Sequence, residues 1–441
     1  MNDVPVFPAA QFRTLSFEMD GSAFVCRAWE GLSYCRSPAD SIQQMHVYAP
    51  ECYFQGKSLN GYTAQTAPVF MPNLVGGYMP GPAARPNAQD GKPNTVLAAL
   101  MHGYVVACAG IRGRSSVKGE APALIVDLKA AIRYLRHNKE LVPGNTDRII
   151  TSGTSAGGAL SARAGARGNA PAYEPYLSAI GAAEERDDVF AANCYCPIIN
   201  LENADSAYEW QFGGERFYRG WHGEGVMDDA QAALSGPLAA LFPGDLNSLA
   251  LTDENGRALR LEQDGTGSFL DYVCELLVQS ARRAQQEQGA QWHTPAYFHQ
   301  ENDCICGMDW PGYVHAITRM KTPPAFDALD LSSPENDLFG TAHFTAFGAS
   351  HSLKNGPMAD ETAVRLVNPM SQLDAPGLAL HWRIRHGSFD RDTSLAIPVM
   401  LALSLRMRGC EVDFRLPWGV PHAGDYDLPE LFQWIDSLCK E

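Results

Sequence analysis

The stretch that decides the fold reads Arg148-Ile-Ile-Thr-Ser-Gly-Thr-Ser155-Ala-Gly-Gly-Ala-Leu-Ser-Ala-Arg163. An apolar, β-leaning run leads into the pattern G-x-S-x-G, and a small-residue run with helical character follows it. This order predicts a nucleophile elbow, in which a strand turns sharply into a helix and holds Ser155 strained with its hydroxyl exposed. The alternative, a Gly/Ser-rich loop, accounts for neither the strand before nor the helix after. We therefore interpret Ser155 as an acyl-transfer nucleophile.

Strand and helix patterns alternate on both sides of this stretch. The helix predicted at 124–138, for example, has apolar residues at Ile125, Leu128, Ile132 and Leu135, which is helical spacing. Such alternation predicts a mostly parallel central sheet with helices on both faces. The other predicted strands are 45–49, 67–71, 104–109, 191–197, 378–385 and 411–416, and the other predicted helices are 94–101, 394–408 and 428–439.

The alternation is lost between residues 201 and 365, where a helix at 269–288 is accompanied by Trp-rich loops and Pro turns. A chain of 441 residues is too long for one small core, so an insertion is expected. Substrate pockets in open α/β sheets lie beyond the carboxyl ends of the strands, where an insertion can cover them. We predict a core of residues 1–200 and 366–441 with an inserted lid at 201–365.

Composition narrows the class of protein. Hydrophobic residues make up 45% and charged residues 19%, which is typical of a soluble globular enzyme. The net charge of −16 argues against nucleic acid or an anionic membrane surface as a partner. The N-terminus lacks the pattern of a secretory signal, and no apolar run reaches transmembrane length. We expect a cytoplasmic protein, or a secreted one if a signal was removed; the sequence does not indicate its oligomeric state.

The eleven cysteines are scattered along the chain, which favours free thiols in a reducing compartment. Cys194-x-Cys196 and Cys304-x-Cys306 suggest zinc, but structural zinc pairs usually have two to four intervening residues and four assembled ligands. Buried or strand-alternating thiols fit these pairs better. We expect no metal and no cofactor.

A serine nucleophile needs a base and a group that orients the base. The chain order for an elbow of this kind is Ser, Asp, His. His422 lies in a turn-rich loop between the last predicted strand and the last helix. The acid is expected after the preceding strand, where Asp390 and Asp392 both occur. We assign the triad role to Asp390 and keep Asp392 as the alternative.

An oxyanion hole needs two converging N–H donors. One is expected from Ala156, directly after the nucleophile. The second is expected from the Gly-containing loop Val75-Gly76-Gly77-Tyr78, which follows an earlier strand. We choose Gly77, with Gly76 as the close alternative; an ordinary Gly-Gly turn explains the local sequence equally well.

Several stretches of the chain resemble the bacterial tannases, which are tannin acyl hydrolases of the α/β-hydrolase superfamily. Together they span most of the chain from the elbow to the C-terminus. The matching stretches are 152–161, 204–210, 321–327, 333–336, 385–393 and 416–427.

The resemblance implies a triad of Ser155, Asp390 and His422, in agreement with the order of the residues. It also implies a galloyl-binding set that carries over to Lys321, Glu335 and Asp392. The galloyl ring presents three adjacent phenolic hydroxyls, so two carboxylates can accept hydrogen bonds while a lysine donates one. Without the resemblance, Lys321 and Glu335 fit a solvated ion pair on the lid equally well.

The sequence thus predicts an α/β-hydrolase fold with a large lid, and a serine esterase that cleaves galloyl esters of gallate esters and hydrolysable tannins. Its partner is a small phenolic ester. Two alternatives remain open: a feruloyl or other aryl-carboxylesterase with the same triad, and a hydrolase-fold protein that binds phenolic ligands without turnover.

Overall fold

The computed structural model describes residues 4–19, 21–220, 223–345, 357–371, 373–374 and 376–440. These residues cluster into two compact units. The first comprises Met1–Tyr195, Arg365–Trp382 and Gly424–Glu441, and the second comprises Cys196–Val364 and Arg383–Ala423. Most of the predicted insertion at 201–365 therefore clusters with 383–423, a segment that the sequence analysis assigned to the core. The function of the insertion as a lid stays a prediction.

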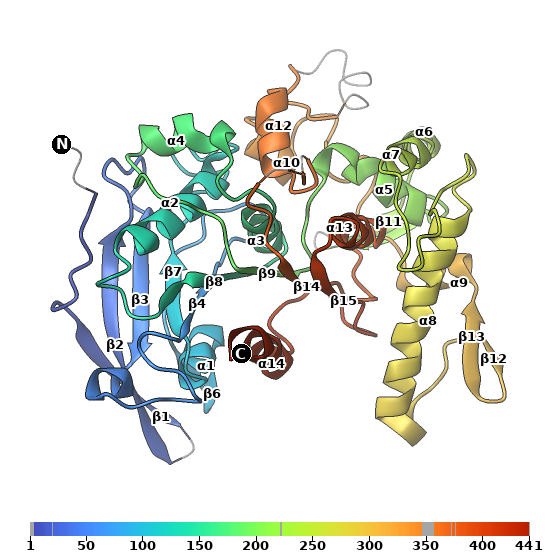
Figure 1. Ribbon diagram of the computed structural model, residues 1–441. Coiled ribbons are helices and arrows are strands. Elements are labelled where there is room, and N and C mark those ends of the chain that lie inside the picture. The colour runs from blue at the N-terminus through green and yellow to red at the C-terminus, as the bar shows by residue number, and fades with distance from the viewer. Residues whose placement is uncertain are drawn as a thin grey trace. The chain divides into compact units, whose positions relative to one another are not determined.

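The central sheet has the strand order β1-β2-β3-β7-β4-β8-β9-β14-β15 (Figure 1). Neighbours from β1 to β7 are antiparallel, and the pairs β7–β4, β4–β8 and β8–β9 are parallel. The strands are β1 Arg13–Met19, β2 Ser22–Ser33, β3 Gln44–Pro50, β4 Pro68–Pro72, β7 Val105–Ala109, β8 Asn145–Thr154, β9 Ala191–Tyr195, β14 His381–Arg385 and β15 Glu411–Arg415.

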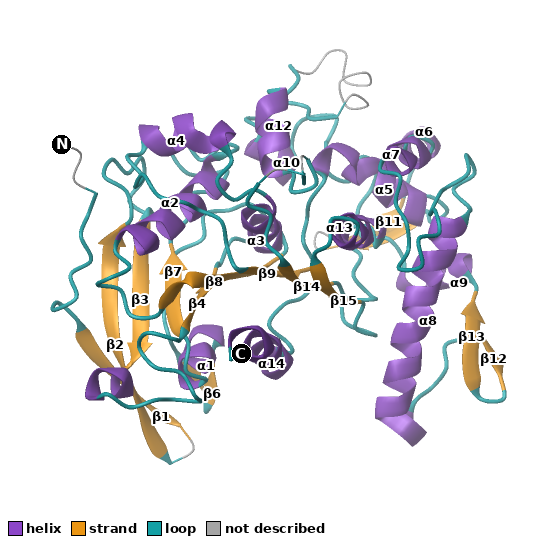
Figure 2. Cartoon of the chain, in the orientation of Figure 1, coloured by secondary structure: helices purple, strands orange, loops and turns teal. Residues whose placement is uncertain are grey.

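Every residue of β4, β7 and β9 is buried, as their mainly apolar sequences require. In the first unit, α2 and α3 cover one face of the strands, whereas α1 and α14 cover the other (Figure 2). Helices on both faces confirm the predicted α/β arrangement. The helices of this unit are η1 Glu51–Gln55, α1 Thr95–Met101, α2 Ala123–His137, α3 Ala156–Ala166, η2 Pro171–Tyr173, α4 Glu174–Ala179 and α14 Leu428–Cys439, and a small hairpin pairs β5 Ala88–Gln89 with β6 Lys92–Pro93.

The second unit is mainly helical. Its longest helix, α8, buries Phe269, Val273 and Leu277 at helical spacing. Further along, Val278 and Ala281 pack with residues of the β12–β13 hairpin. The elements are α5 Leu201–Phe212, β10 Phe217–Gly220, β11 Gly223–Val226, α6 Asp229–Ala239, α7 Phe242–Ser248, α8 Ser268–Gln288, η3 Gly289–Gln291, β12 Phe298–Glu301, β13 Cys304–Met308, α9 Trp310–Ile317, α10 Pro334–Leu338 and α13 Ala396–Arg406. Helix α12 Glu361–Val367 and strand β14 each contain residues of both units.

The order of the parallel strands creates a switch point in the first unit. From β4 the chain continues to β7 on one side, and later to β8 on the other. Ligand sites in open α/β sheets form outside the carboxyl ends of strands at such a point. The loop after β4 and Ser155 after β8 both lie there. None of the described helices is at once long and apolar enough to cross a membrane.

Candidate active site

Ser155 occupies the sharp turn between β8 and α3. Its backbone has φ 61° and ψ −123°, a conformation that costs energy for any residue with a Cβ. The Ser155 N–H donates a hydrogen bond of 3.0 Å to the Tyr195 carbonyl, so β9 helps to hold the strained residue. The predicted strand, turn and helix are all present, and the geometry is that of a nucleophile elbow.

The two glycines of the G-x-S-x-G pattern have no room for a side chain. A Cβ at Gly153 would lie 2.3 Å from the Gly157 carbonyl oxygen, and a Cβ at Gly157 would lie 2.5 Å from Asn73 Oδ1. Asn73 Nδ2 donates to the carbonyls of Ser152 (2.9 Å) and Gly157 (3.1 Å). This buried amide ties the loop after β4 to the elbow, a role that the sequence analysis missed because nothing in the sequence pairs residue 73 with residue 157.

The loop proposed to complete the oxyanion hole is a tight turn. Gly77 and Tyr78 both have positive φ (53° and 57°), and Met79 N–H donates to the Gly76 carbonyl at 2.9 Å. Two successive positive φ angles are typical of a type I′ turn, which explains a glycine at position 77. Arg114 Nε donates to the Gly77 carbonyl at 3.0 Å and so anchors the turn. Ala156 begins α3, as the elbow requires.

In the second unit, backbone hydrogen bonds join the loop that carries Asp390 to the loop that carries His422. Ser388 N–H donates to the Pro417 carbonyl, and Phe389 N–H donates to the Val420 carbonyl, both at 3.0 Å. A Cβ at Gly387 would lie 2.0 Å from the Val420 carbonyl oxygen, so the close approach requires glycine. The backbone therefore brings the predicted acid and base together.

His422 Nδ1 lies 2.7 Å from Asp390 Oδ2, and Asp390 is fully buried. Asp392 N–H donates to the other Asp390 oxygen at 2.8 Å. Burial is the largest single influence and would lower the pKa of His422, but the hydrogen bonds and charges of Asp390 and Cys196 together outweigh it and raise that pKa above its usual value. Burial would raise the pKa of Asp390, but His386 and His422 lower it. Asp390 is therefore the carboxylate that contacts Nδ1.

Asp392 lies at the opposite nitrogen of the imidazole. Its Oδ2 is 3.4 Å from His422 Nε2, and its Oδ1 is 2.6 Å from Lys321 Nζ. The ammonium of Lys321 also lies 3.9 Å above the Phe326 ring. Burial would lower the pKa of Lys321, but Asp392 and Glu335 raise it, so the lysine stays charged. Glu335 lies on α10, whose N-cap Ser333 accepts a hydrogen bond from Asn336 N–H.

The hydroxyl of Tyr208 joins the segments that carry Lys321 and Asp392. It accepts hydrogen bonds from the N–H groups of Met320 (2.9 Å) and Lys321 (3.0 Å), and it donates one to the Arg391 carbonyl (3.0 Å). Tyr208 is completely buried. The sequence pattern around Tyr208 indicates only packing, since its hydrogen-bond partners are more than a hundred residues away.

A buried ion pair holds the same segment from the other side. Arg319 Nη1 donates to Glu209 Oε2 at 3.1 Å, and both side chains are fully buried. Arg319 Nε donates to the Lys321 carbonyl at 2.7 Å. Neighbouring residues of α5, Tyr208 and Glu209, thus both fix the backbone of Lys321.

All eleven cysteines lie in the described part of the chain, and none of them forms a disulfide. Cys304 and Cys306 alternate with buried Ile305 on β13 and are exposed. Cys196, just after β9, is buried with its Sγ 3.9 Å from His422 Nε2. Nothing in the sequence connects Cys196 or Cys194 with His422.

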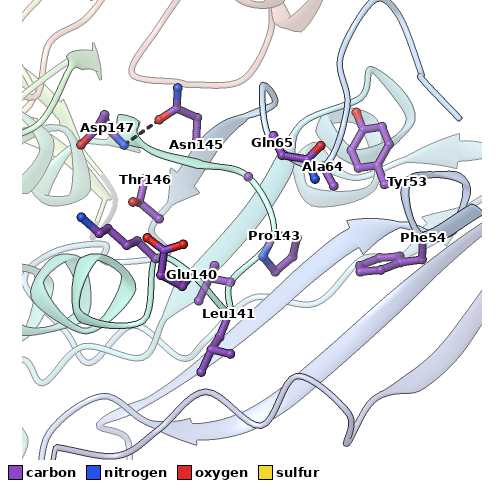
Figure 3. A pocket seen from close by; sticks show the side chains of 13 residues that line it. Tyr53, Phe54, Ala64, Gln65, Glu140, Leu141, Pro143, Asn145, Thr146 and Asp147 are labelled. Atoms are coloured by element: carbon purple, nitrogen blue, oxygen red, sulfur yellow. Dashed lines mark hydrogen bonds between the residues drawn. The ribbon is translucent and has the colours of Figure 1, made fainter. Parts of the chain in front are cut away.

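The first unit also has an open groove of about 720 Å³ (Figure 3). It is lined by residues around Tyr53 and Gln65 and by residues 139–147. Asn145 and Asp147 belong to the start of β8, whereas Ser155 follows its end. Because ligand sites in open α/β sheets lie at the carboxyl ends of strands, this groove is at the wrong end of β8 for the substrate.

Comparison with known proteins identifies the family. The tannin acyl hydrolase from Lactobacillus plantarum is 46% identical, with a TM-score of 0.95 and 98% of each chain covered. The tannase of Fusobacterium nucleatum is 43% identical, with a TM-score of 0.95 and all of each chain covered. The chain belongs to the tannase family. The resemblance found in the sequence is thereby confirmed, and so are the α/β-hydrolase fold and the prediction of a carboxylic ester hydrolase.

Other comparisons agree with membership of the tannase family. Residues 67–211 match the BD-FAE family of α/β-hydrolases. Esterase LipQ of Mycobacterium tuberculosis is 35% identical over 102 residues, which are 23% of this chain and 23% of that esterase. A tannin acyl hydrolase in complex with ethyl gallate is 46% identical, with a TM-score of 0.95 and 98% of each chain covered.

Proposed function

We propose that the protein hydrolyses galloyl esters through an acyl-enzyme on Ser155 and releases gallic acid. His422 is the general base, Asp390 orients it, and the N–H groups of Ala156 and Gly77 stabilise the oxyanion. Lys321, Glu335 and Asp392 bind the phenolic hydroxyls. The observation that carries the proposal is the Lys321–Asp392 ion pair, in which the second Asp392 oxygen faces His422 Nε2.

The chain near the two candidate residues supports their pairing. A Cβ at Gly424 would lie 1.8 Å from Thr154 Oγ1, so these two residues of the first unit are in contact. Thr154 directly precedes Ser155, and Gly424 follows His422 by two residues. Since consecutive Cα atoms are about 3.8 Å apart, the chain allows His422 only a short distance from Gly424.

The proposed reaction has two steps. With Nδ1–H donating to Asp390, the lone pair of His422 Nε2 takes the Ser155 proton while the serine oxygen attacks the ester carbonyl. The tetrahedral intermediate collapses, and the alcohol leaves with that proton. A water, deprotonated by the same nitrogen, then attacks the acyl-enzyme, and gallic acid leaves as Ser155 regains its proton.

Recognition of the galloyl ring follows from the charges beside His422. Carboxylates accept strong hydrogen bonds from phenolic hydroxyls, and the Lys321 ammonium donates one. A site built to bind hydroxyls leaves its buried polar groups unpaired when an analogue lacks them, so discrimination against that analogue is large. The related tannin acyl hydrolase in complex with ethyl gallate supports a small phenolic ester as the substrate.

The proposal is tested by comparing kcat/KM for methyl gallate, methyl ferulate and methyl benzoate, with Ser155→Ala as the blank. We expect kcat/KM for methyl gallate to exceed that for the other two esters by roughly several hundredfold or more. A site built to hydrogen-bond hydroxyls rejects analogues that lack them by large factors. Comparable rates on all three esters would leave a serine esterase without a galloyl site. A preference for methyl ferulate would favour the feruloyl esterase alternative.

A further inference from the structure

A cluster of buried polar side chains links the segments that carry Lys321 and Glu335, and the proposed mechanism does not use it. Its centre is Asp327, whose side chain is fully buried together with those of Asn336 and His343. Burying a polar group is costly unless the group is hydrogen-bonded. A cluster of this kind, away from the reacting atoms, therefore points to segments that must be held in one arrangement.

Asp327 accepts hydrogen bonds at both of its carboxylate oxygens. Its Oδ1 accepts from Asn336 Nδ2 at 2.8 Å and from His343 Nδ1 at 2.9 Å. Its Oδ2 accepts from the N–H groups of Phe344 (3.1 Å) and Thr345 (2.9 Å), and also from the Thr345 hydroxyl at 2.9 Å. The carboxylate therefore joins helix α10 to the segment that follows it.

Asn336 transmits this contact to Glu335. The two residues are neighbours on α10, and both are buried. Besides its bond to Asp327, the Asn336 amide donates to the Ala342 carbonyl at 3.0 Å, and the Asn336 backbone carbonyl accepts from Thr341 N–H at 2.7 Å. A rotation of α10 would break these bonds, so the direction of the Glu335 carboxylate depends on the Asn336 side chain.

The same cluster holds the aromatic ring that lies against Lys321. Lys321 Nζ is 3.9 Å from the centre of the Phe326 ring. Phe326 N–H donates to Asp205 Oδ1 at 2.7 Å, and the Phe326 carbonyl accepts from the Ser333 hydroxyl at the start of α10. Asp205 Oδ2 accepts from Asp327 N–H at 3.1 Å. The backbone of Phe326 is thus held by α5 at its N–H and by α10 at its carbonyl.

We propose that Asp327 and Asn336 are positioning residues that set the place of Glu335 relative to Lys321, and thereby the preference for hydroxylated acyl groups. Both side chains are fully buried, so they act through Glu335 and not on the substrate itself. Glu335 raises the pKa of Lys321, so its carboxylate lies close enough for both groups to bind one ligand. A binding group is selective only when its neighbours hold it within about 0.5 Å of its productive position.

The inference rests on the proposed galloyl-binding role of Lys321 and Glu335, and it is tested first with Asn336→Ala. This variant removes the bond to Asp327 and keeps Glu335. We would measure the ratio of kcat/KM for methyl gallate to kcat/KM for methyl benzoate. We expect the ratio to fall about three- to tenfold, the value of one weakened hydrogen bond to a charged group. The value for methyl benzoate should stay within about twofold of the wild type, because that ester has no ring hydroxyl.

Asn247→Ala is the control, since Asn247 is an asparagine of the same unit whose amide also bonds two backbone groups. It donates to the Leu261 carbonyl at 2.8 Å and accepts from Leu261 N–H at 3.0 Å. This variant should keep the wild-type ratio. An equal loss on both esters in Asn336→Ala, or an equal fall of the ratio in the two variants, would show that the cluster serves the fold alone and would overturn the proposal.

An exchange of the two side chains tests the contact itself. Asp327→Asn and Asn336→Asp each leave polar groups without a matching partner, so each should lower the ratio about tenfold. In the double variant the amide at position 327 can donate to the carboxylate at position 336, and His343 can accept the second amide hydrogen in its other tautomer. We expect the ratio to return to within about threefold of the wild type, since only the bond to the Ala342 carbonyl stays lost. A double variant no better than the single ones would refute the contact.

Binding of gallic acid to Ser155→Ala, measured by calorimetry, provides a readout without turnover. Adding Asn336→Ala to this background should raise Kd about three- to tenfold. An unchanged Kd, together with a wild type that prefers methyl gallate, would overturn the positioning role and leave the proposed function intact. A wild type that does not distinguish methyl gallate from methyl benzoate would overturn the proposed function and the positioning role with it.

Discussion

The two compact units carry their chemistry in different ways. In the first, the proposed nucleophile lies within one contiguous stretch, and its presentation depends on the backbone: Ser155 has φ 61°, and a Cβ at Gly153 or Gly157 would collide with its neighbours. In the second, Lys321 and Asp392 come from segments about seventy residues apart and are joined through Tyr208 from a third. A site that depends on local backbone conformation leaves a short motif in the sequence, whereas a network of side chains from distant segments does not.

The same difference predicts how each unit affects the reaction. In the proposed mechanism the elbow acts on the ester carbonyl, which every substrate has, so changes there should affect all esters equally. In the proposed mechanism the network around Lys321 binds the acyl group, so changes there should distinguish esters by their hydroxyls. The following substitutions test this division, in order of decreasing effect.

Ser155→Ala should abolish hydrolysis of gallate, ferulate and benzoate esters alike, with a loss in kcat of roughly 10⁴-fold or more. The control is Ser161→Ala, since Ser161 is a buried serine of the same helix. It should keep activity within a few-fold of the wild type. Turnover by Ser155→Ala that clearly exceeds the uncatalysed rate would show that the nucleophile is another residue.

Asp390→Asn should lower kcat for every ester by about 10⁴-fold, because the amide no longer fixes the base tautomer. Asp390 raises the pKa of His422, so its loss should lower that pKa. Since the base must be deprotonated, the acidic limb of the residual kcat/KM profile should move to lower pH. A limb that stays in place or moves to higher pH would contradict this assignment.

Asp392→Asn should reduce kcat/KM for methyl gallate by about 10- to 100-fold, the value of one or two hydrogen bonds to a charged group. Methyl benzoate has no ring hydroxyl and should change by no more than about threefold. The measurement is the ratio of the two kcat/KM values in variant and wild type. An equal loss on both esters would mean that Asp390 and Asp392 have exchanged roles.

Tyr208→Phe should raise KM for methyl gallate by about five- to tenfold, because three neutral hydrogen bonds that place Lys321 and Asp392 are removed. The value of kcat for methyl benzoate should stay unchanged, which a purely structural role would not predict. Tyr272→Phe is the control, since this tyrosine of the second unit bonds Glu254 instead. Equal KM changes in the two variants would remove the positioning role.

The smallest effect on activity is expected at Asp436 in α14. It accepts hydrogen bonds from Tyr62 (2.8 Å), Tyr104 (2.8 Å) and Lys440 (2.7 Å). Burial opposes its charge, but these bonds and His102 lower its pKa to about 2. A lowered carboxyl pKa stabilises the fold above the unfolded-state value of about 3.9 and ceases to do so as the pH falls through the folded-state value.

Asp436→Asn should therefore unfold at lower denaturant concentration than the wild type at neutral pH. The difference in the free energy of unfolding should shrink as the pH falls from about 4 towards 2. Denaturant titrations at several pH values measure it, with kcat as the control. A difference that is independent of pH would mean that packing, and not the charge, anchors α14.

The fold was predictable where one short pattern decides one element. Apolar runs identified β7 and β9, and helical spacing identified α2 and α8, because burial on a sheet or along a helix face imposes its own period. The grouping of 383–423 with the inserted segment was not predictable. It depends on contacts among residues far apart in the chain, which leave no periodic signal.

The sequence by itself determined the elbow at Ser155, the α/β order and the chain order of Ser, Asp and His, since each rests on neighbouring residues or on a strand followed by its loop. Only the tertiary structure decided that Asp390 contacts Nδ1 while Asp392 lies at Nε2, that Tyr208 and Glu209 fix the Lys321 segment, and that Cys196 faces His422. Hydrogen bonds and ion pairs are short-ranged and directional, so the partners of a buried polar group are set only once the backbone has brought distant segments together.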